Sequence, residues 1–283
     1  MSWNQFSYIC RKAHATFDSS QQNIAAHIDN IKHEQNCRLY GKNIQPNTWS
    51  AKILNIIANQ KDPKKAQEIL KTYSNLRLDN RLEQPMQFKR VMAYLTYISL
   101  IFFILATIYQ LKVIPTFVET MDSFSLDTAN YLSFYRHFGV YIVTLVFLSL
   151  LGALFLGFHL KKFFHLSPNI EKGFISRFFV LQSVINSHNK IVEALVFPIR
   201  DSLEDTIPST STINEHLRDI DQKDMCLATE MQAIINHEII VLTEKCEKQM
   251  KVLYTIIAIV IVLTISEFIS SAYAPIFILG DYI

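Results

Sequence analysis

VMAYLTYISLIFFILATIY (Val91–Tyr109) is the first of three apolar runs in a chain of 283 residues. The other two are FGVYIVTLVFLSLLGALFLGF (Phe138–Phe158) and VLYTIIAIVIVLTI (Val252–Ile265). An α-helix rises about 1.5 Å per residue, so about 20 apolar residues cross the hydrocarbon core of a bilayer. The first two runs meet that length. The third reaches it only by continuing to Ala274, which places Glu267 inside it. The runs predict a membrane protein with three transmembrane helices.

Basic residues indicate how these helices are oriented. They flank the runs at Lys89, Arg90, Lys161, Lys162, Lys245, Lys248 and Lys251. The loop between the first two runs holds few basic residues, and no Lys or Arg follows the third run. Because positive residues accumulate on the cytoplasmic side of membrane proteins, we expect a cytoplasmic N-terminus and an external C-terminus.

The resulting fold class is an all-α membrane protein with three transmembrane helices and two small cytoplasmic helical-bundle domains. Few glycines and prolines and the helical spacing of apolar residues support this class. The expected order is a cytoplasmic helical domain at 1–90, transmembrane helix 1 at 91–111, an outer loop at 112–137, transmembrane helix 2 at 138–160, a second cytoplasmic helical domain at 161–250, transmembrane helix 3 at 251–274 and an outer tail at 275–283.

Within the first cytoplasmic segment, apolar residues recur every three or four positions, as on an amphipathic helix. They are Trp3, Phe6, Cys10, Ala13 and Phe17. Asp62 followed by Pro63 predicts a helix start, because Asp caps helix N-termini and Pro suits the first helical position. In the second segment, Thr212 and Glu215 match a capping box.

Two further patterns concern the second cytoplasmic segment. An apolar helix face is formed by Phe174, Ile175, Phe178, Phe179, Val184 and Ile185. No proline or glycine occurs from Asp221 to Ala274, so one helix, or two nearly continuous ones, is expected to enter the third span. Its cytoplasmic part should bury Met225, Ala228, Met231, Ile235 and Leu242.

Small residues recur every four positions in two spans, at Ser149, Ala153 and Gly157 and at Ser266, Ser270 and Ala274. Such stripes let helix backbones approach closely in lipid, so they predict packing within the chain or between copies. Glu267 has two interpretations. It lies near the outer boundary, where it reaches the headgroups, or it faces a neighbouring subunit or a passing helix.

Signatures of enzymes are missing from the sequence. His237-Glu238 begins a zinc-protease motif, but Val241 stands where the second histidine ligand is required. The chain has no phosphate-binding Gly-x-x-x-x-Gly-Lys motif and no Gly-x-Ser-x-Gly elbow. Its four cysteines include no Cys-x-x-Cys pair. We therefore expect no enzymatic activity, no cofactor, no metal and no nucleic-acid partner.

Charge is distributed unevenly between the two cytoplasmic segments. Residues 1–90 hold 14 Lys and Arg against 7 Asp and Glu, whereas residues 161–251 hold 11 against 13. A basic segment beside a membrane attracts anionic lipid headgroups. An acidic protein partner explains the same bias, and so does the requirement for membrane topology alone. A basic face at Lys61, Lys64, Lys65 and Lys71 is the candidate contact surface, unless it is simply solvated.

Three segments carry a family resemblance. The C-terminal AYAPIFILG (Ala272–Gly280) contains Pro275, Ile276 and Phe277, and VIPTF (Val113–Phe117) contains Pro115 and Phe117. Together with Asn169–Leu195, these segments resemble the type II secretion protein F family, the inner-membrane platform proteins of type IV pilus and type II secretion machines. The order of domains and spans is also similar, and the chain looks like a pilus-type member.

The resemblance implies a non-enzymatic, oligomeric protein of the bacterial inner membrane, whose outer loop and tail are periplasmic. Its expected partners are lipid, copies of itself, a hexameric assembly ATPase, the transmembrane helices of pilin or pseudopilin, and other inner-membrane components of the machine. Cytoplasmic contact with the ATPase would drive extraction of pilin subunits from the membrane. The basic face then becomes a candidate ATPase contact, and the small-residue stripes with Glu267 become candidate contacts for helix packing or pilin.

Two other functional classes remain open. A membrane receptor or adaptor, whose cytoplasmic helices bind a soluble partner without a motor, predicts the same topology. A transporter or channel subunit normally shows polar groups in mid-span or broken helices, which the three runs do not show.

Overall fold

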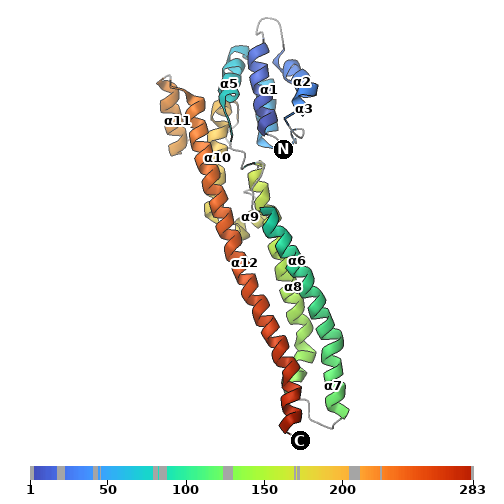
Figure 1. Ribbon diagram of the computed structural model, residues 1–283. Coiled ribbons are helices and arrows are strands. Elements are labelled where there is room, and N and C mark those ends of the chain that lie inside the picture. The colour runs from blue at the N-terminus through green and yellow to red at the C-terminus, as the bar shows by residue number, and fades with distance from the viewer. Residues whose placement is uncertain are drawn as a thin grey trace. The chain divides into compact units, whose positions relative to one another are not determined.

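The computed structural model describes residues 3–17, 23–40, 44, 46–78, 82, 88–123, 130–168, 170, 173–203, 211–223 and 225–281. In these residues every regular element is helical (Figure 1). The chain divides into two compact units. The polar unit comprises Met1–Met86 with His159–Glu247, and the apolar unit comprises Gln87–Phe158 with Lys248–Ile283.

The polar unit is built from short helices of both predicted cytoplasmic segments. They are α1 (Trp3–Thr16), α2 (Ile24–His33), α3 (Gln35–Arg38), α4 (Trp49–Ala58), α5 (Pro63–Asn75), α9 (Phe174–Phe179), α10 (Gln182–Val196), the 3₁₀ helix η4 (Phe197–Ser202) and α11 (Thr212–Gln222). It also includes the end of α8 (Asn130–Phe164) and the beginning of α12 (Leu227–Asp281).

The predicted stripe of α1 is confirmed, because its apolar residues are buried. Phe6 contacts Tyr73 of α5 edge to face, with ring centroids 5.5 Å apart. The predicted start of α5 is also confirmed. The side chain of Asp62 accepts a hydrogen bond from the Lys64 amide, and Pro63 occupies the first helical position. For α11 the predicted cap was one residue late, because Ser211 rather than Thr212 caps the helix.

The two predicted cytoplasmic domains form one unit in this structure, so their expected division into separate bundles is not confirmed. The Tyr73 hydroxyl donates a 2.7 Å hydrogen bond to the Leu195 carbonyl, and both residues are buried. Lys65 forms an ion pair with Asp201 at 3.0 Å. A physical reason is size, because the fraction of surface that a domain buries rises with its chain length, and combining two segments enlarges the shared core.

The core of the second segment differs in part from the expected one. Val184 and Ile185 are buried on α10, as predicted. By contrast, Phe174, Phe178 and Phe179 are exposed on α9, so the predicted apolar face lies in the core only at its α10 residues. The backbone becomes extended at Val180 (φ −96°, ψ 134°), which breaks the helical register between the two groups.

Helix α12 confirms a continuous helix entering the third span, since it runs without a break from Leu227 to Asp281. Three of its expected core residues, Met231, Ile235 and Leu242, are fully buried, and Ala228 is also buried. Met225 precedes the helix and is exposed, so that prediction was wrong.

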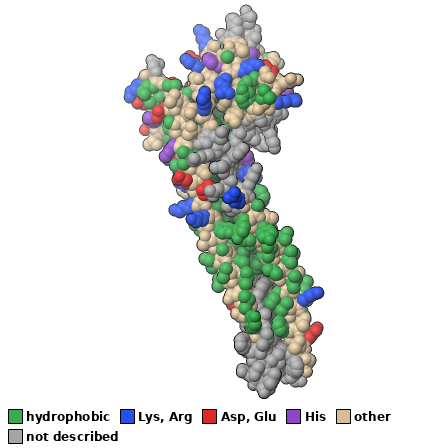
Figure 2. Space-filling model, in the orientation of Figure 1, with side chains coloured by type: hydrophobic (Ala, Val, Ile, Leu, Met, Phe, Trp, Pro, Cys, Tyr) green, Lys and Arg blue, Asp and Glu red, His purple; other side chains and the backbone are tan. Residues whose placement is uncertain are grey.

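The apolar unit contains α6 (Phe88–Ile108), the π-helical turn η2 (Tyr109–Val113), α7 (Ile114–Ser123) and the remaining parts of α8 and α12. Among the described residues, three stretches are long and apolar enough to cross a membrane: Ala93–Thr120, Val143–Phe164 and Leu227–Glu267. Figure 2 shows hydrophobic side chains gathered over these helices. The expectation of a multi-pass membrane protein is therefore supported by three helices of the required length and composition.

Aromatic contacts join the helices of the apolar unit. Phe103 of α6 lies 5.0 Å from Phe147 of α8, between ring centroids. Tyr94 of α6 lies 5.4 Å from Tyr254 of α12. Other large apolar side chains, including Leu148 and Val262, are exposed, as expected of side chains that face lipid.

Two segments that were expected to lie outside the spans contain helix. The expected outer loop 112–137 includes α7 and the start of α8, and only 124–129 lie outside the described residues. Pro115 is the second residue of α7, directly after the π-helical turn. Because proline has no amide hydrogen, regular helical bonding is interrupted there. The expected tail 275–283 continues α12 as far as Asp281.

Replacing Tyr73 by Phe should destabilise the polar unit, because the buried Leu195 carbonyl loses its hydroxyl donor. We expect a loss of about 1–2 kcal/mol in the free energy of unfolding. Denaturation of the full chain in detergent, followed by circular dichroism, measures this loss. Tyr97→Phe, at an exposed position in the apolar unit, is the matched control and should change nothing. Equal stability of the two variants would show that the hydrogen bond from Tyr73 to the Leu195 carbonyl does not stabilise the polar unit.

The buried His188 should make the folded protein less stable in mild acid. Its ring lies buried against Phe163, with centroids 5.2 Å apart, and burial lowers its pKa to about 4, with a small opposing effect from Asn189. The unfolded chain takes up this proton near pH 6.5, whereas the folded chain does so only near pH 4. Stability therefore falls as the pH drops from 6.5 towards 4, by about 2 kcal/mol between pH 7 and pH 5.

The control for this effect is His188→Phe, which keeps an aromatic ring beside Phe163 and removes the titrating group. Unfolding of the variant, measured at pH 7 and pH 5, should show a smaller difference than unfolding of the wild type. The same difference in both proteins would show that other groups cause the acid sensitivity.

Candidate functional site

The small-residue stripe of α8 is partly buried. Ala153 and Gly157 are buried, whereas Ser149 is exposed and its hydroxyl donates a 2.6 Å hydrogen bond to the Val146 carbonyl. A serine that bonds within its own helix presents little polarity to the surroundings. The stripe therefore provides two buried positions for close packing and a third position on the surface.

In α12 the first two residues of the equivalent stripe, Ser266 and Ser270, lie on the surface. Ser266, Glu267 and Ser270 are all exposed on consecutive turns of the helix. The structure thus leaves these three side chains accessible to another helix or to lipid headgroups. Ala274 and the family-pattern residues Pro275, Ile276 and Phe277 lie in α12, but their side chains fall outside the described ones.

The other family-pattern residues lie on α7. Pro115 is exposed and Phe117 is partly buried. Both therefore belong to a helix that continues directly from α6 through η2, rather than to a loop.

The candidate basic face lies on and just before α5. Lys61, Lys64 and Lys71 are exposed. Lys65 differs, because its ammonium group already pairs with Asp201 of the second segment. Its role is at least partly structural, which leaves three exposed ammonium groups for a partner.

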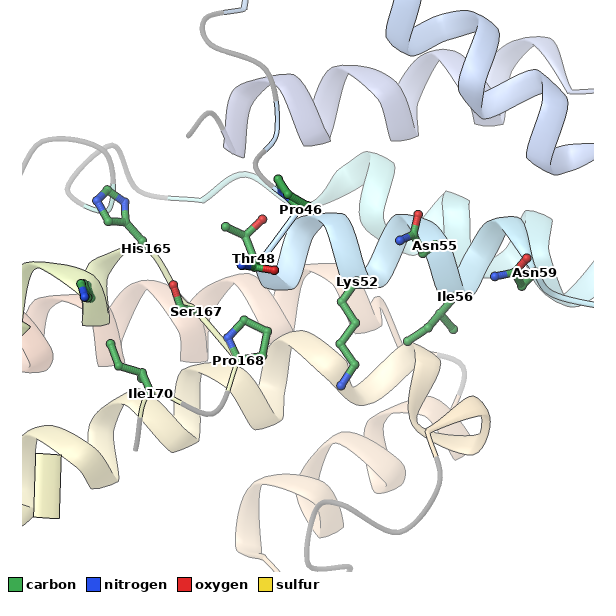
Figure 3. Close-up of a pocket in the computed structure, with 12 residues that line it drawn as sticks. Pro46, Thr48, Lys52, Asn55, Ile56, Asn59, His165, Ser167, Pro168 and Ile170 are labelled. Atoms are coloured by element: carbon green, nitrogen blue, oxygen red, sulfur yellow. The ribbon is translucent and has the colours of Figure 1, made fainter. Parts of the chain in front are cut away.

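A pocket of about 760 Å³, which the sequence did not predict, opens within the polar unit between α4 and the chain that follows α8 (Figure 3). Its lining residues are Pro46, Asn47, Thr48, Lys52, Asn55, Ile56, Asn59, Lys162, His165, Ser167, Pro168 and Ile170. In Figure 3, Lys52, Asn55 and Asn59 follow one another along α4, and the Lys52 side chain points away from that helix.

Local backbone geometry forms this pocket. Helix α8 ends at Phe164, and Leu166 adopts a left-handed conformation (φ 45°) that reverses the chain. This conformation is uncommon for leucine. Leu166 is buried, and its carbonyl accepts a 3.2 Å hydrogen bond from the Trp49 amide at the start of α4. That bond attaches α4 to the chain that follows α8, and these two segments form the walls of the pocket.

The chemistry of the pocket is that of an open, basic hollow. Its two cations are Lys52 and Lys162, and the Lys52 ammonium lies 4.6 Å from the centre of the Trp49 ring. Burial lowers the pKa of His165, and nearby positive charge, including Lys161, lowers it further. His165 is therefore neutral near pH 7. No carboxylate is among the lining residues, so these side chains offer hydrogen-bond donors to an anionic group and no acidic ligand to a cation.

Potential metal ligands do not cluster in the part of the chain that the structure describes. No cluster of three His, Cys, Asp or Glu side chains is placed to hold a metal ion there. The cysteines Cys10, Cys37 and Cys246 are buried separately, and Cys226 is exposed. The arrangement is one of packing surfaces and charged faces.

Comparisons of the chain with protein families, with curated protein sequences and with solved structures found no match.

Proposed function

We propose that this chain is an inner-membrane platform protein of a type IV pilus or type II secretion machine. In this role it couples a cytoplasmic hexameric ATPase to the extraction and polymerisation of pilin or pseudopilin subunits. The proposal rests first on the resemblance at Val113–Phe117, Asn169–Leu195 and Ala272–Gly280. Three apolar helices and a polar helical unit support it by providing a membrane part and a docking part in one chain.

The observation that carries the proposal is the continuity of α12. Its first part buries Met231, Ile235 and Leu242 in the polar unit, and its second part exposes Ile259 and Val262 in the apolar unit. No break interrupts the helix between them. A continuous helix resists bending, because every turn is held by backbone hydrogen bonds. Movement of the polar unit is thereby conveyed along α12 into the membrane.

Within the membrane, the exposed turn of α12 is the contact surface for a partner helix. Ser266, Glu267 and Ser270 offer small and polar surface to a neighbouring helix. Small residues permit close approach of a second helix in lipid. A pilin helix, or a second copy of this chain, is the partner expected at this face.

Breaking α12 tests the coupling. Lys248→Pro changes an exposed residue at the division between the two units and removes a helical hydrogen bond, at a cost of about 3 kcal/mol or more. Because Lys248 is not in the core, the polar unit should still fold and the chain should still insert. Assembly of pili should be lost, as counted by electron microscopy of the cells.

The matched control is Lys248→Ala, which removes the same charge and keeps the helix. Cells that carry it should assemble pili normally. Normal assembly in the Lys248→Pro variant would refute the coupling role of α12. It would favour the adaptor class, in which the cytoplasmic helices bind a partner without transmitting force.

The basic face generates a second prediction. Reversing two exposed charges, with Lys64→Glu and Lys71→Glu together, should weaken co-purification of the hexameric ATPase roughly tenfold, because charge complementarity guides such contacts. The comparison is Arg218→Glu with Lys223→Glu, which reverses two exposed charges of the same unit, one on α11 and one at its C-cap. An equal loss in both double variants would assign the effect to net charge and not to this face.

A further inference from the structure

Helix α9 exposes an unusual amount of aromatic surface for part of a polar unit. The exposed fractions are 72% for Phe174, 65% for Phe178 and 60% for Phe179, and 49% for Leu181 just beyond the helix. The rings of Phe174 and Phe178 lie 4.7 Å apart, so they form one patch. Phenylalanine is usually buried, and a contiguous exposed apolar patch marks a surface that is covered in the working protein.

A second observation fixes where this patch lies. Ser176, the one buried residue of α9, donates a 2.6 Å hydrogen bond to the Ile170 carbonyl. Its oxygen lies 2.8 Å from Nε2 of His159 on α8. Since the serine hydrogen is already used, His159 must donate this bond through Nε2. Helix α9 is thus attached to the last turns of α8.

His159 marks the end of the second apolar run, because it directly follows Phe158. From this point α8 continues with Lys161 and Lys162, the basic residues expected on the cytoplasmic side of a span. A helix tied to His159 therefore lies at the depth where the chain leaves the hydrocarbon core. The exposed Arg177 adds a positive charge to α9 itself.

We propose that α9 is a membrane-interface helix that inserts Phe174, Phe178 and Phe179 into the leaflet from which α8 emerges. The occupant of this apolar surface is lipid, with acyl chains against the rings and anionic headgroups near Arg177. Aromatic residues with basic neighbours are typical of short helices that lie in the plane of a bilayer. The helix provides a membrane anchor within the polar unit, independent of the platform role proposed above.

The test measures the surroundings of single spin labels on the full chain in vesicles of phosphatidylethanolamine and phosphatidylglycerol. Cys226→Ser removes the exposed cysteine, and the three remaining cysteines are buried. Labels are placed with Phe178→Cys or Phe174→Cys on α9. Leu148→Cys, exposed in the second span, provides the lipid reference, and Glu215→Cys, exposed on α11, provides the water reference.

Collisions with oxygen, which concentrates in lipid, are compared with collisions with a nickel chelate, which stays in water. We expect the α9 labels to collide with the chelate roughly five-fold less than the Glu215 label, and to collide with oxygen more often than that label does. Chelate access equal to that at Glu215 would overturn the proposal. So would shielding from both reagents, which would mean that protein covers the patch. Water access at Leu148 would overturn both the anchor and the assignment of the second span.

Discussion

The hydrocarbon core of a bilayer offers no hydrogen-bond partner to the backbone, and this constraint underlies the architecture of the whole chain. Every amide and carbonyl within a span must be satisfied inside its own segment, which a helix achieves. The three apolar stretches are accordingly parts of long helices. The first stretch contains an irregularity, the π-helical turn at Tyr109–Val113, directly before α7 with its Pro115.

The same constraint explains how the polar unit is assembled. Met1–Met86 and His159–Glu247 form one compact unit, and an even number of membrane crossings between these two segments is compatible with their shared core. The link from Tyr73 to Leu195 and the pair of Lys65 with Asp201 join segments more than a hundred residues apart. A core shared in this way cannot form until the second span has been made.

Features that depend only on residues close together along the chain could be predicted from the sequence. Span length, the capped start of α5 at Asp62 and the uninterrupted helix leading to Ala274 follow from local composition. The pocket could not be predicted in the same way. It depends on the left-handed Leu166 and on the bond from Trp49 to Leu166, which join residues far apart in sequence.

Helix α9 shows why apolar periodicity identifies an amphipathic helix and not the medium that its apolar face contacts. Phe174 and Phe178 have the same spacing as core residues of α1, and that spacing is equally suited to protein and to lipid. Context separates the two cases. On α10, Val184 and Ile191 are buried and have polar residues between them. Helix α9 has only about two turns, lies beside the end of a span and buries only Ser176. A short, phenylalanine-rich helix directly after a span is therefore better assigned to the membrane surface than to a core.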